Sequence, residues 1–350
     1  MVTNSLQLIL KVGRDALIVA LITVGLGELS LRIYNLVDPL PIFYSDSYNR
    51  FRGKPFAPNW ESHLNSQGFN DVEFSAHKAA GTVRILGIVD SFAFGVVPYE
   101  YNYLTLLEKY LSQGRDNVEL INMGIPNIGP REYLSLLVRE GFALEPDKVL
   151  LSFFIGNDFQ DAAPQRRSLV SYSYALSLGT YVLKRWSKFE GRIVHGEATY
   201  DDNAPTLTDN AYLELELSRS NLFLTTNQSF NVLLAAALSY IAEIKRLCDR
   251  RHIGLTIALI PDELQVSEPL QRGVIAKSGL SPTVFNFLLP NRQLRASLEE
   301  LKIDYVDLIT GMSAHSPGDR LYRRNDSHWN IAGNELAAQL IFQHLAQLMD

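Results

Sequence analysis

Residues 84–89 read RILGIV, one arginine followed by an unbroken apolar run, and Asp90, Ser91 and Phe92 come directly after it. A continuous apolar run of this length is typical of a parallel strand that is buried on both faces. Two similar runs follow downstream, at 117–121 (NVELI) and 148–155 (KVLLSFFI). Together the three runs predict neighbouring parallel strands and therefore an α/β fold.

Helical patterns alternate with apolar runs over the remainder of the chain. Amphipathic stretches predict five helices, at residues 101–111, 131–141, 231–251, 291–301 and 331–348. Two further apolar runs predict a fourth and a fifth strand, at residues 254–260 and 304–308. Five parallel strands with crossover helices predict a flavodoxin-like three-layer sandwich, with a five-stranded parallel sheet between two layers of helices.

The composition is that of an ordinary globular chain. With 350 residues, of which 47% are hydrophobic and 20% charged, the chain is long enough to bury a full α/β core. The net charge of −6 and the absence of a Lys/Arg-rich run argue against a nucleic-acid partner. Cys248 is the only cysteine, which excludes internal disulfides and thiolate metal clusters, and we expect a small buried side chain there.

The N-terminal segment requires a separate interpretation. Residues 16–27 (ALIVALITVGLG) are uninterrupted by charge, with Lys11 and Arg14 before them and Glu28 and Arg32 after them. A run of 12 residues is shorter than the about 20 residues that a helix needs to span a bilayer. If the helix extends to residue 36, it gains only a few charged side chains, which stand near its ends and can snorkel to the membrane surface. Residues 1–36 therefore predict an N-terminal signal anchor, a single transmembrane helix.

The flanks of this segment predict its processing and its orientation. No small-x-small cleavage site follows the apolar run, so we expect the segment to remain on the protein. The basic residues before the run predict a cytoplasmic N-terminus, with the rest of the chain membrane-anchored and extracytoplasmic, in the periplasm or at the cell surface. The alternative is an amphipathic helix that packs on the protein or lies in the membrane interface.

Three segments follow the predicted anchor. Residues 37–80 are rich in Pro, Asn, Ser and aromatic residues without a sustained period, which predicts an extended arm. Residues 81–350 form the predicted α/β domain. Within it, residues 161–227 break the strand–helix rhythm, and an insertion of this length is typical of a lid or a surface for a membrane-complex partner.

Polar blocks stand directly after the three first apolar runs and again near the C-terminus. They are Asp90-Ser91, Asn122-Met123-Gly124, Gly156-Asn157-Asp158 and Asp326-Ser327-His328-Trp329-Asn330. Ligands of open α/β sheets bind at the carboxyl ends of the strands, so these blocks predict one shared site.

The residue types in these blocks are those of nucleophilic catalysis on a carbonyl. A serine hydroxyl needs an adjacent base, for which His328 is the candidate, and a carboxylate such as Asp326 holds the imidazole in the required tautomer. Backbone N–H groups and a neutral amide can bind the oxyanion that develops.

The order and content of the blocks resemble the SGNH/GDSL hydrolase family, whose namesake residues are Ser, Gly, Asn and His. The resemblance implies that Ser91 is the nucleophile, that His328 and Asp326 complete the catalytic set, and that Ser91, Gly124 and Asn157 form the oxyanion hole. It implies no cofactor and no metal. The six other histidines show no metal-ligand spacing, and no Gly-rich phosphate loop follows a strand.

Each block taken alone also has a purely structural interpretation. Asp90 and Ser91 can cap a helix, Gly124 before Pro126 can form a turn, and Asp326 can cap the closing helix. The joint occurrence of all the blocks in the family's order favours the shared site.

Two positions depart from the family's usual pattern. Val89 stands where the family usually has glycine, and its branched side chain is expected to crowd the nucleophile turn, which leaves the activity uncertain. Asn127 stands where a second glycine is common. Residues 65–70 (NSQGFN) resemble an Asn-x-x-Gly-Phe element of membrane-anchored members, for which we expect a structural role.

The site predicts acyl-ester chemistry on an acylated carbohydrate or another ester. Water as acceptor gives a serine esterase, and a sugar hydroxyl gives an O-acyltransferase. The two-residue spacing of Asp326 and His328 and the single N-terminal anchor resemble the polysaccharide O-acetyltransferase branch, which implies acetyl esters of a cell-surface glycan. The alternative is a catalytically silent SGNH-like accessory subunit of a membrane protein complex, for which Ser91 and His328 would lie beyond hydrogen-bond reach.

Overall fold

The strand order confirms the predicted flavodoxin-like fold. In the computed structural model, which describes residues 2–38, 40–43, 47–113, 117–163, 168–188, 199–315 and 320–349, one sheet has the order β4-β3-β5-β6-β7 with all pairs parallel. Its strands are β3 (Val83–Ile88), β4 (Val118–Asn122), β5 (Lys148–Phe154), β6 (Gly254–Ile260) and β7 (Asp304–Asp307). This 2-1-3-4-5 order places a topological switch point beside β3.

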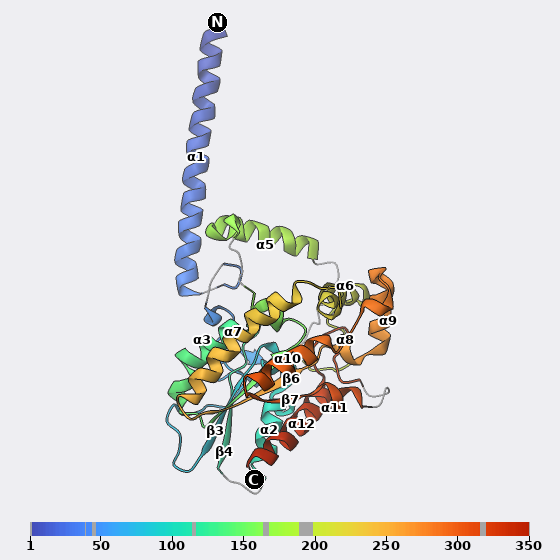
Figure 1. Ribbon diagram of the computed structural model, residues 1–350. Helices are drawn as coiled ribbons and strands as arrows, with labels where there is room; N and C mark the ends of the chain where they lie inside the picture. The colour runs from blue at the N-terminus through green and yellow to red at the C-terminus, as the bar shows by residue number, and fades with distance from the viewer. Residues whose placement is uncertain are drawn as a thin grey trace. The chain divides into compact units, whose positions relative to one another are not determined.

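Helices cover both faces of the sheet, as Figure 1 shows. The longer helices in the part of the chain that contains the sheet are α2 (Tyr103–Leu111), α3 (Pro130–Arg139), α6 (Asp209–Arg219), α7 (Phe230–Asp249), α9 (Glu268–Ser278), α10 (Leu289–Glu300) and α12 (Ile331–Met349). Short helices are α4 (Asp158–Asp161), α8 (Glu263–Val266) and α11 (Ile309–Ser313). The helix α2 packs on α12, and α3 packs on α7.

The five predicted helices are present within one to two residues of their predicted ends, whereas α6, α8, α9 and α11 were not predicted. The helix α9 illustrates why. Ser267 caps it and Pro269 stands in its first turn, but its apolar positions are few, because one face of this helix is exposed. Local periodicity therefore gave too weak a signal for this helix.

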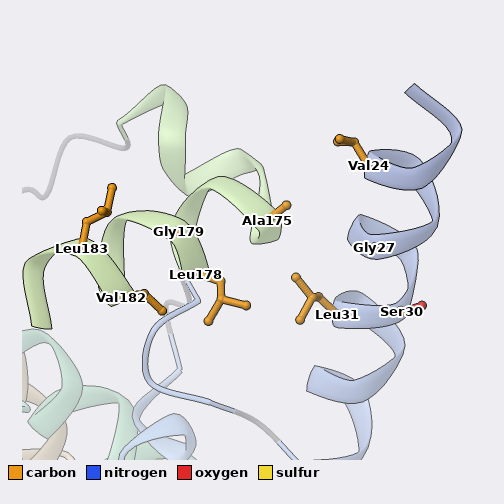
Figure 2. A pocket seen from close by; sticks show the side chains of 9 residues that line it. All are labelled: Val24, Gly27, Ser30, Leu31, Ala175, Leu178, Gly179, Val182 and Leu183. Atoms are coloured by element: carbon orange, nitrogen blue, oxygen red, sulfur yellow. The ribbon is translucent and has the colours of Figure 1, made fainter. Parts of the chain in front are cut away.

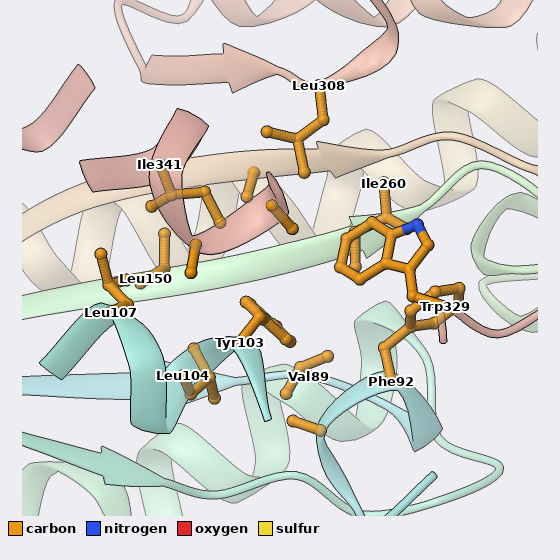
Figure 3. Close-up of a cluster of buried hydrophobic side chains, with 14 of the residues drawn as sticks. Val89, Phe92, Tyr103, Leu104, Leu107, Leu150, Ile260, Leu308, Trp329 and Ile341 are labelled. Atoms are coloured by element: carbon orange, nitrogen blue, oxygen red, sulfur yellow. The ribbon is translucent and has the colours of Figure 1, made fainter. Parts of the chain in front are cut away.

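A cluster of buried side chains joins the sheet to α2 and α12. Figure 3 shows Val89, Tyr103, Leu104 and Ile341 in this cluster, with the Trp329 indole at one end. Each of these five side chains is at most 1% exposed. Cys248 on α7 is also fully buried, as expected for a small apolar side chain.

The chain divides into two compact units, one of residues 1–50 and 165–190 and one of residues 51–164 and 191–350. The first unit contains α1 (Val2–Val37), η1 (Tyr48–Arg50), η5 (Leu169–Tyr172) and α5 (Tyr174–Lys188). In α1, residues 10–37 are long and apolar enough to cross a membrane, and they are exposed except for the half-buried Glu28 and Leu31 and the buried Asn35. This helix coincides with the predicted anchor.

The segment predicted as an extended arm contains a small hairpin, β1 (Pro58–Asn59) and β2 (Ser62–His63). After the hairpin, the side-chain oxygen of Asn65 accepts the N–H groups of Gln67 and Phe69, and Phe69 is fully buried. Gly68 has φ +79° and lies against the backbone of Gly53, where a Cβ would not fit. The Asn-x-x-Gly-Phe element is therefore a folded turn with a packing role.

An ion pair between the buried Arg84 and the half-buried Glu119 lies at the start of β3. The Arg84 side chain is 1% exposed, and its guanidinium contacts the Glu119 carboxylate at 2.7 Å and the carbonyl oxygens of Leu144 and Ala76 at 2.6 and 3.1 Å. Removal of one partner from a buried pair leaves the other charge without compensation.

We therefore expect Arg84→Leu to lower the free energy of unfolding by about 3–5 kcal/mol. The control is Arg272→Leu on α9, whose side chain is 69% exposed and whose ion pair with Glu268 is long; its expected effect is below about 0.5 kcal/mol. Urea unfolding followed by circular dichroism measures both. Equal effects of the two substitutions would contradict the importance of the pair between Arg84 and Glu119.

Candidate functional site

Ser91 begins a tight turn at the carboxyl end of β3. The turn is the 3₁₀ helix η2 (Ser91–Ala93), and the Asp90 carboxylate caps it by accepting the Phe92 N–H at 3.0 Å. The cap interpretation of Asp90 is thus correct. It does not exclude a chemical role for Ser91, because the half-buried Ser91 projects from the first position of the turn, and its N–H has no acceptor within the described part of the chain.

Val89 does not crowd the serine. Its side chain is fully buried in the cluster of Figure 3, near Tyr103 and Leu104, on the core side of the turn. Ser91, two residues on, is half-buried and its Oγ contacts His328, so the two side chains have different surroundings.

The structure brings Ser91, His328 and Asp326 together although 237 residues separate the first two. Ser91 Oγ lies 2.8 Å from His328 Nε2, and His328 Nδ1 lies 2.6 Å from Asp326 Oδ1. A carboxylate only accepts hydrogen bonds, so Nδ1 carries the proton and Nε2 is left to accept the serine hydroxyl. This is the arrangement in which an imidazole can take the proton of a serine.

The Asp326 carboxylate remains ionised although it is 8% exposed. Burial alone would raise its pKa, but His328, the Thr206 hydroxyl and Arg323 together hold the pKa of Asp326 well below its usual range. An ionised carboxylate stabilises the imidazolium that forms when His328 takes a proton.

A short hairpin-like loop positions His328. Tyr322 and Trp329 form an isolated antiparallel bridge, and the Arg323 N–H donates to the His328 carbonyl at 2.9 Å. The Trp329 ring packs edge-on against Phe92 with centroids 4.8 Å apart. Because Phe92 follows Ser91 and Trp329 follows His328, this contact sets the spacing between nucleophile and base.

Residues 199–209, which we call the strap, form hydrogen bonds with this loop. The Thr206 hydroxyl donates to Asp326 Oδ2 at 2.6 Å, and the Asn325 side chain donates to the Leu207 carbonyl at 2.8 Å. Arg320 donates to the Asp202 carbonyl at 2.7 Å. The strap is the part of the predicted insertion 161–227 that contacts the site, and sequence patterns gave no signal for Thr206.

Thr206 is thus a positioning residue for Asp326. We expect Thr206→Val, which keeps the shape and removes the donor, to lower kcat for p-nitrophenyl acetate about tenfold with little change in KM. Thr206→Ser retains the hydroxyl and is expected to restore most of the rate. An unchanged kcat in Thr206→Val, or a change in KM alone, would show that the hydrogen bond to Asp326 does not support catalysis, and a loss confined to Thr206→Ser would assign the effect to packing of the methyl group.

The predicted oxyanion donors differ in their availability. The Asn157 amide has no hydrogen-bond partner among the described residues, and its oxygen is buried. In contrast, the Gly124 N–H already donates to Asn122 Oδ1 at 2.9 Å. Gly124 also packs closely, since a Cβ would come within 3.0 Å of Ala93. The structure therefore presents the Ser91 N–H and the Asn157 amide as open donors, whereas the Gly124 N–H is engaged with Asn122, and the assignment of Gly124 to the oxyanion hole stays a prediction.

Asn122 forms several hydrogen bonds around the site, a role that the sequence did not predict. Its N–H donates to Asp71, and its side-chain amide donates to the carbonyls of Asn70 and Ala93, both at 2.9 Å. It thus connects the arm to the nucleophile turn and to Gly124. In the same block Asn127 has φ +57°, a left-handed conformation that glycine and asparagine tolerate best, which explains asparagine at the family's glycine position.

Three buried carboxyl groups lie behind the nucleophile turn. Burial raises the pKa of Asp90 to about 6 and that of Asp161 to about 7, and burial together with Asp90 raises the pKa of Asp158. The Tyr133 hydroxyl donates to both oxygens of Asp158 at 3.1 Å. Like charges in one buried region oppose one another's ionisation.

The Asp90 pKa predicts a pH dependence of stability. Because the pKa of Asp90 is higher in the folded than in the unfolded protein, the folded protein binds the proton of this carboxyl group more tightly. The free energy of unfolding therefore falls as pH rises from 3.8 towards about 6. Asp90→Asn keeps a capping oxygen without the charge. We expect it to increase the unfolding free energy relative to the native chain by up to about 3 kcal/mol at pH 7.5 and by much less at pH 4.5.

Urea unfolding at both pH values measures this effect. Asp201→Asn is the matched control, because Asp201 also caps an N–H two residues on, that of Asn203 at 2.8 Å, but is exposed. A pH-independent difference between Asp90→Asn and the native chain would contradict the buried-charge explanation.

An aromatic pair and an arginine stand beside the catalytic carboxylate. Trp60 at the hairpin tip meets Tyr200 edge-on with centroids 5.1 Å apart, and the Arg323 guanidinium lies over both rings. The Trp60 indole N–H donates to the Gly95 carbonyl at 2.7 Å, just beyond the nucleophile turn. Trp60 has φ +52°, a costly conformation for a tryptophan.

Among the described residues, no group of three or more His, Cys, Asp or Glu side chains could hold a metal ion.

Comparison with known families agrees with this geometry. Residues 219–349 match the family model described as the SGNH hydrolase-like domain of the acetyltransferase AlgX. This part of the chain is thus similar to an SGNH hydrolase-like domain. The match includes Asp326 and His328, whereas Ser91, Gly124 and Asn157 lie upstream of it, and the predicted SGNH/GDSL resemblance is confirmed.

Several solved structures are similar to the chain at low sequence identity. An acetyl xylan esterase, AlAXEase, is 15% identical over 75% of this chain and 98% of its own, with a TM-score of 0.41. TesA is 10% identical over 76% and 99%, with a TM-score of 0.43. The lipase/acylhydrolase from Enterococcus faecalis is 14% identical over 76% and 97%, with a TM-score of 0.37. No curated protein sequence matches the chain.

Proposed function

We propose that the protein is a membrane-anchored SGNH-type serine esterase or O-acyltransferase that acts on acetyl esters of a cell-surface glycan. The observation that carries this proposal is the continuous set of contacts from Ser91 Oγ through the His328 ring to Asp326. The 2.8 Å distance between Ser91 and His328 supports an active enzyme over the alternative of a silent accessory subunit.

The mechanism follows from the positions of these groups. Ser91 Oγ attacks the ester carbonyl while His328 Nε2 takes the hydroxyl proton, and the Ser91 N–H and the Asn157 amide bind the oxyanion. His328 then gives the proton to the departing alcohol, which leaves an acyl-serine. Water or a sugar hydroxyl attacks this ester, His328 again takes the proton, and Ser91 is released with acetate or an acetylated acceptor as the product.

A carbohydrate substrate is supported by the surroundings of the site. Trp60 and Tyr200 are half-buried aromatic side chains from two segments outside the sheet, and both lie next to Arg323, which contacts Asp326. Aromatic faces are common platforms for apolar ring surfaces with polar rims, such as those of sugars. The family model named for an acetyltransferase supports acetyl as the acyl group.

The membrane context is supported by α1. Residues 10–37 can span a bilayer, and Lys11 and Arg14 at their N-terminal side favour a cytoplasmic N-terminus with the SGNH domain outside. This orientation would place the site on the side of the membrane where cell-surface glycans are found.

The test is acetate release from p-nitrophenyl acetate and from an acetylated oligosaccharide, with an unacetylated oligosaccharide added as acceptor. We expect the native chain to release acetate and Ser91→Ala to release none. A transferase would also produce acetylated acceptor, which mass spectrometry detects. A folded native chain without release from either substrate would overturn the proposal and favour the silent accessory subunit.

A further inference from the structure

The N-terminal unit contains a second apolar helix, α5, whose first turn is bound to α1 by polar side chains, which we call the polar layer. The Glu28 carboxylate of α1 accepts the N–H groups of Tyr174 and Ala175 at 3.0 and 2.9 Å and the Ser173 hydroxyl at 2.9 Å. Glu28 thereby caps the start of α5, where the helix dipole favours a negative charge. Arg32 pairs with Glu28 and lies over the Tyr174 ring.

An apolar groove lies between the two helices next to this polar layer. Figure 2 shows Val24 and Leu31 of α1 on one side, and Leu178 and Val182 of α5 on the other. The volume of the groove is about 650 Å³. Glycine at 27 and 179 leaves the space open, and we infer that something apolar fills it, since water gains few partners there.

The rim of the groove and the neighbouring surface of α5 are also apolar and uncovered. Leu183 and Val24, which line the groove, are 66% and 61% exposed, and Leu176 of α5 is 57% exposed. Soluble proteins rarely expose contiguous apolar surface of this kind without a partner. The tyrosines at 34, 172 and 181 of the same unit are also exposed, and tyrosine is enriched at membrane–water interfaces.

We propose that α5 lies in the membrane interface beside α1, and that lipid acyl chains fill the groove between them. The groove is continuous with the exposed apolar surface of α1, so the lipid acyl chains that surround α1 would also fill the groove. The apolar part of α5, Tyr174–Leu183, is too short to span a bilayer, which takes about 20 residues. Figure 1 shows α5 running away from α1 at a steep angle, as an interfacial helix beside a spanning helix does.

This arrangement also accounts for the short apolar run of α1. Glu28 directly follows residue 27 and Arg32 stands four residues further on, so both lie inside the length that a spanning helix needs. With Glu28 satisfied by the first turn of α5 and Arg32 paired with it, both charges can lie at the level of the lipid head groups. The proposal rests on the anchoring role proposed for α1.

The experiment is a depth measurement on the full-length chain in phosphatidylcholine/phosphatidylglycerol liposomes. Nitroxide labels are placed singly at Leu176→Cys and Leu183→Cys, and relaxation by oxygen is compared with relaxation by a water-soluble nickel chelate. Val19→Cys in the apolar run of α1 reports the bilayer interior, and Leu280→Cys, 46% exposed in the other unit, reports water. Cys248 is buried, so the native chain controls for background labelling.

We expect the ratio of oxygen to nickel accessibility at 176 and 183 to lie between those at 19 and 280. Values equal to that at 280, with a deep label at 19, would overturn the α5 proposal alone. An aqueous label at 19 would overturn the anchor as well. Spin–spin broadening at 183 that disappears on dilution with unlabelled chain would show that a second copy fills the groove, which also overturns the proposal.

Discussion

The edge-on contact between Trp329 and Phe92 is the constraint on which the site depends. Ser91 and His328 come from distant parts of the sequence, and each is the immediate neighbour of one of these two buried rings. Protein interiors are close-packed, so the rings can meet in few ways, and the 2.8 Å approach of Ser91 Oγ to Nε2 follows from their packing. The catalytic geometry is therefore a property of the core.

The second constraint is that Asp326 has different partners on its two oxygens. One oxygen accepts the His328 ring N–H and backbone N–H, and the other accepts the Thr206 hydroxyl with Arg323 nearby at 3.5 Å. A carboxylate that is held from both sides cannot rotate away from the imidazole, and it stays charged although it is buried. The strap thus gives part of the insertion a function in the site itself.

Sequence patterns predicted the sheet and the main site residues, but not their supports. The strands were predictable because buried parallel strands read as continuous apolar runs, and Ser91, Asn157 and His328 because polar blocks follow those runs or stand in a recognisable order. Thr206 acts through one hydrogen bond and Asn122 through several, most of them between residues far apart in the sequence, which leave no local pattern. The occupied N–H of Gly124 could not be predicted either, since it depends on the rotamer of a neighbouring side chain.

The central claim is that Ser91 is an activated nucleophile. The most direct measurement is peptide mapping by mass spectrometry after treatment of the purified full-length protein with a fluorophosphonate. The account predicts one adduct, on Ser91, whose formation slows about 100-fold or more in His328→Gln because the general base is lost. A well-folded native chain that forms no adduct, or forms it on another residue, would contradict the account.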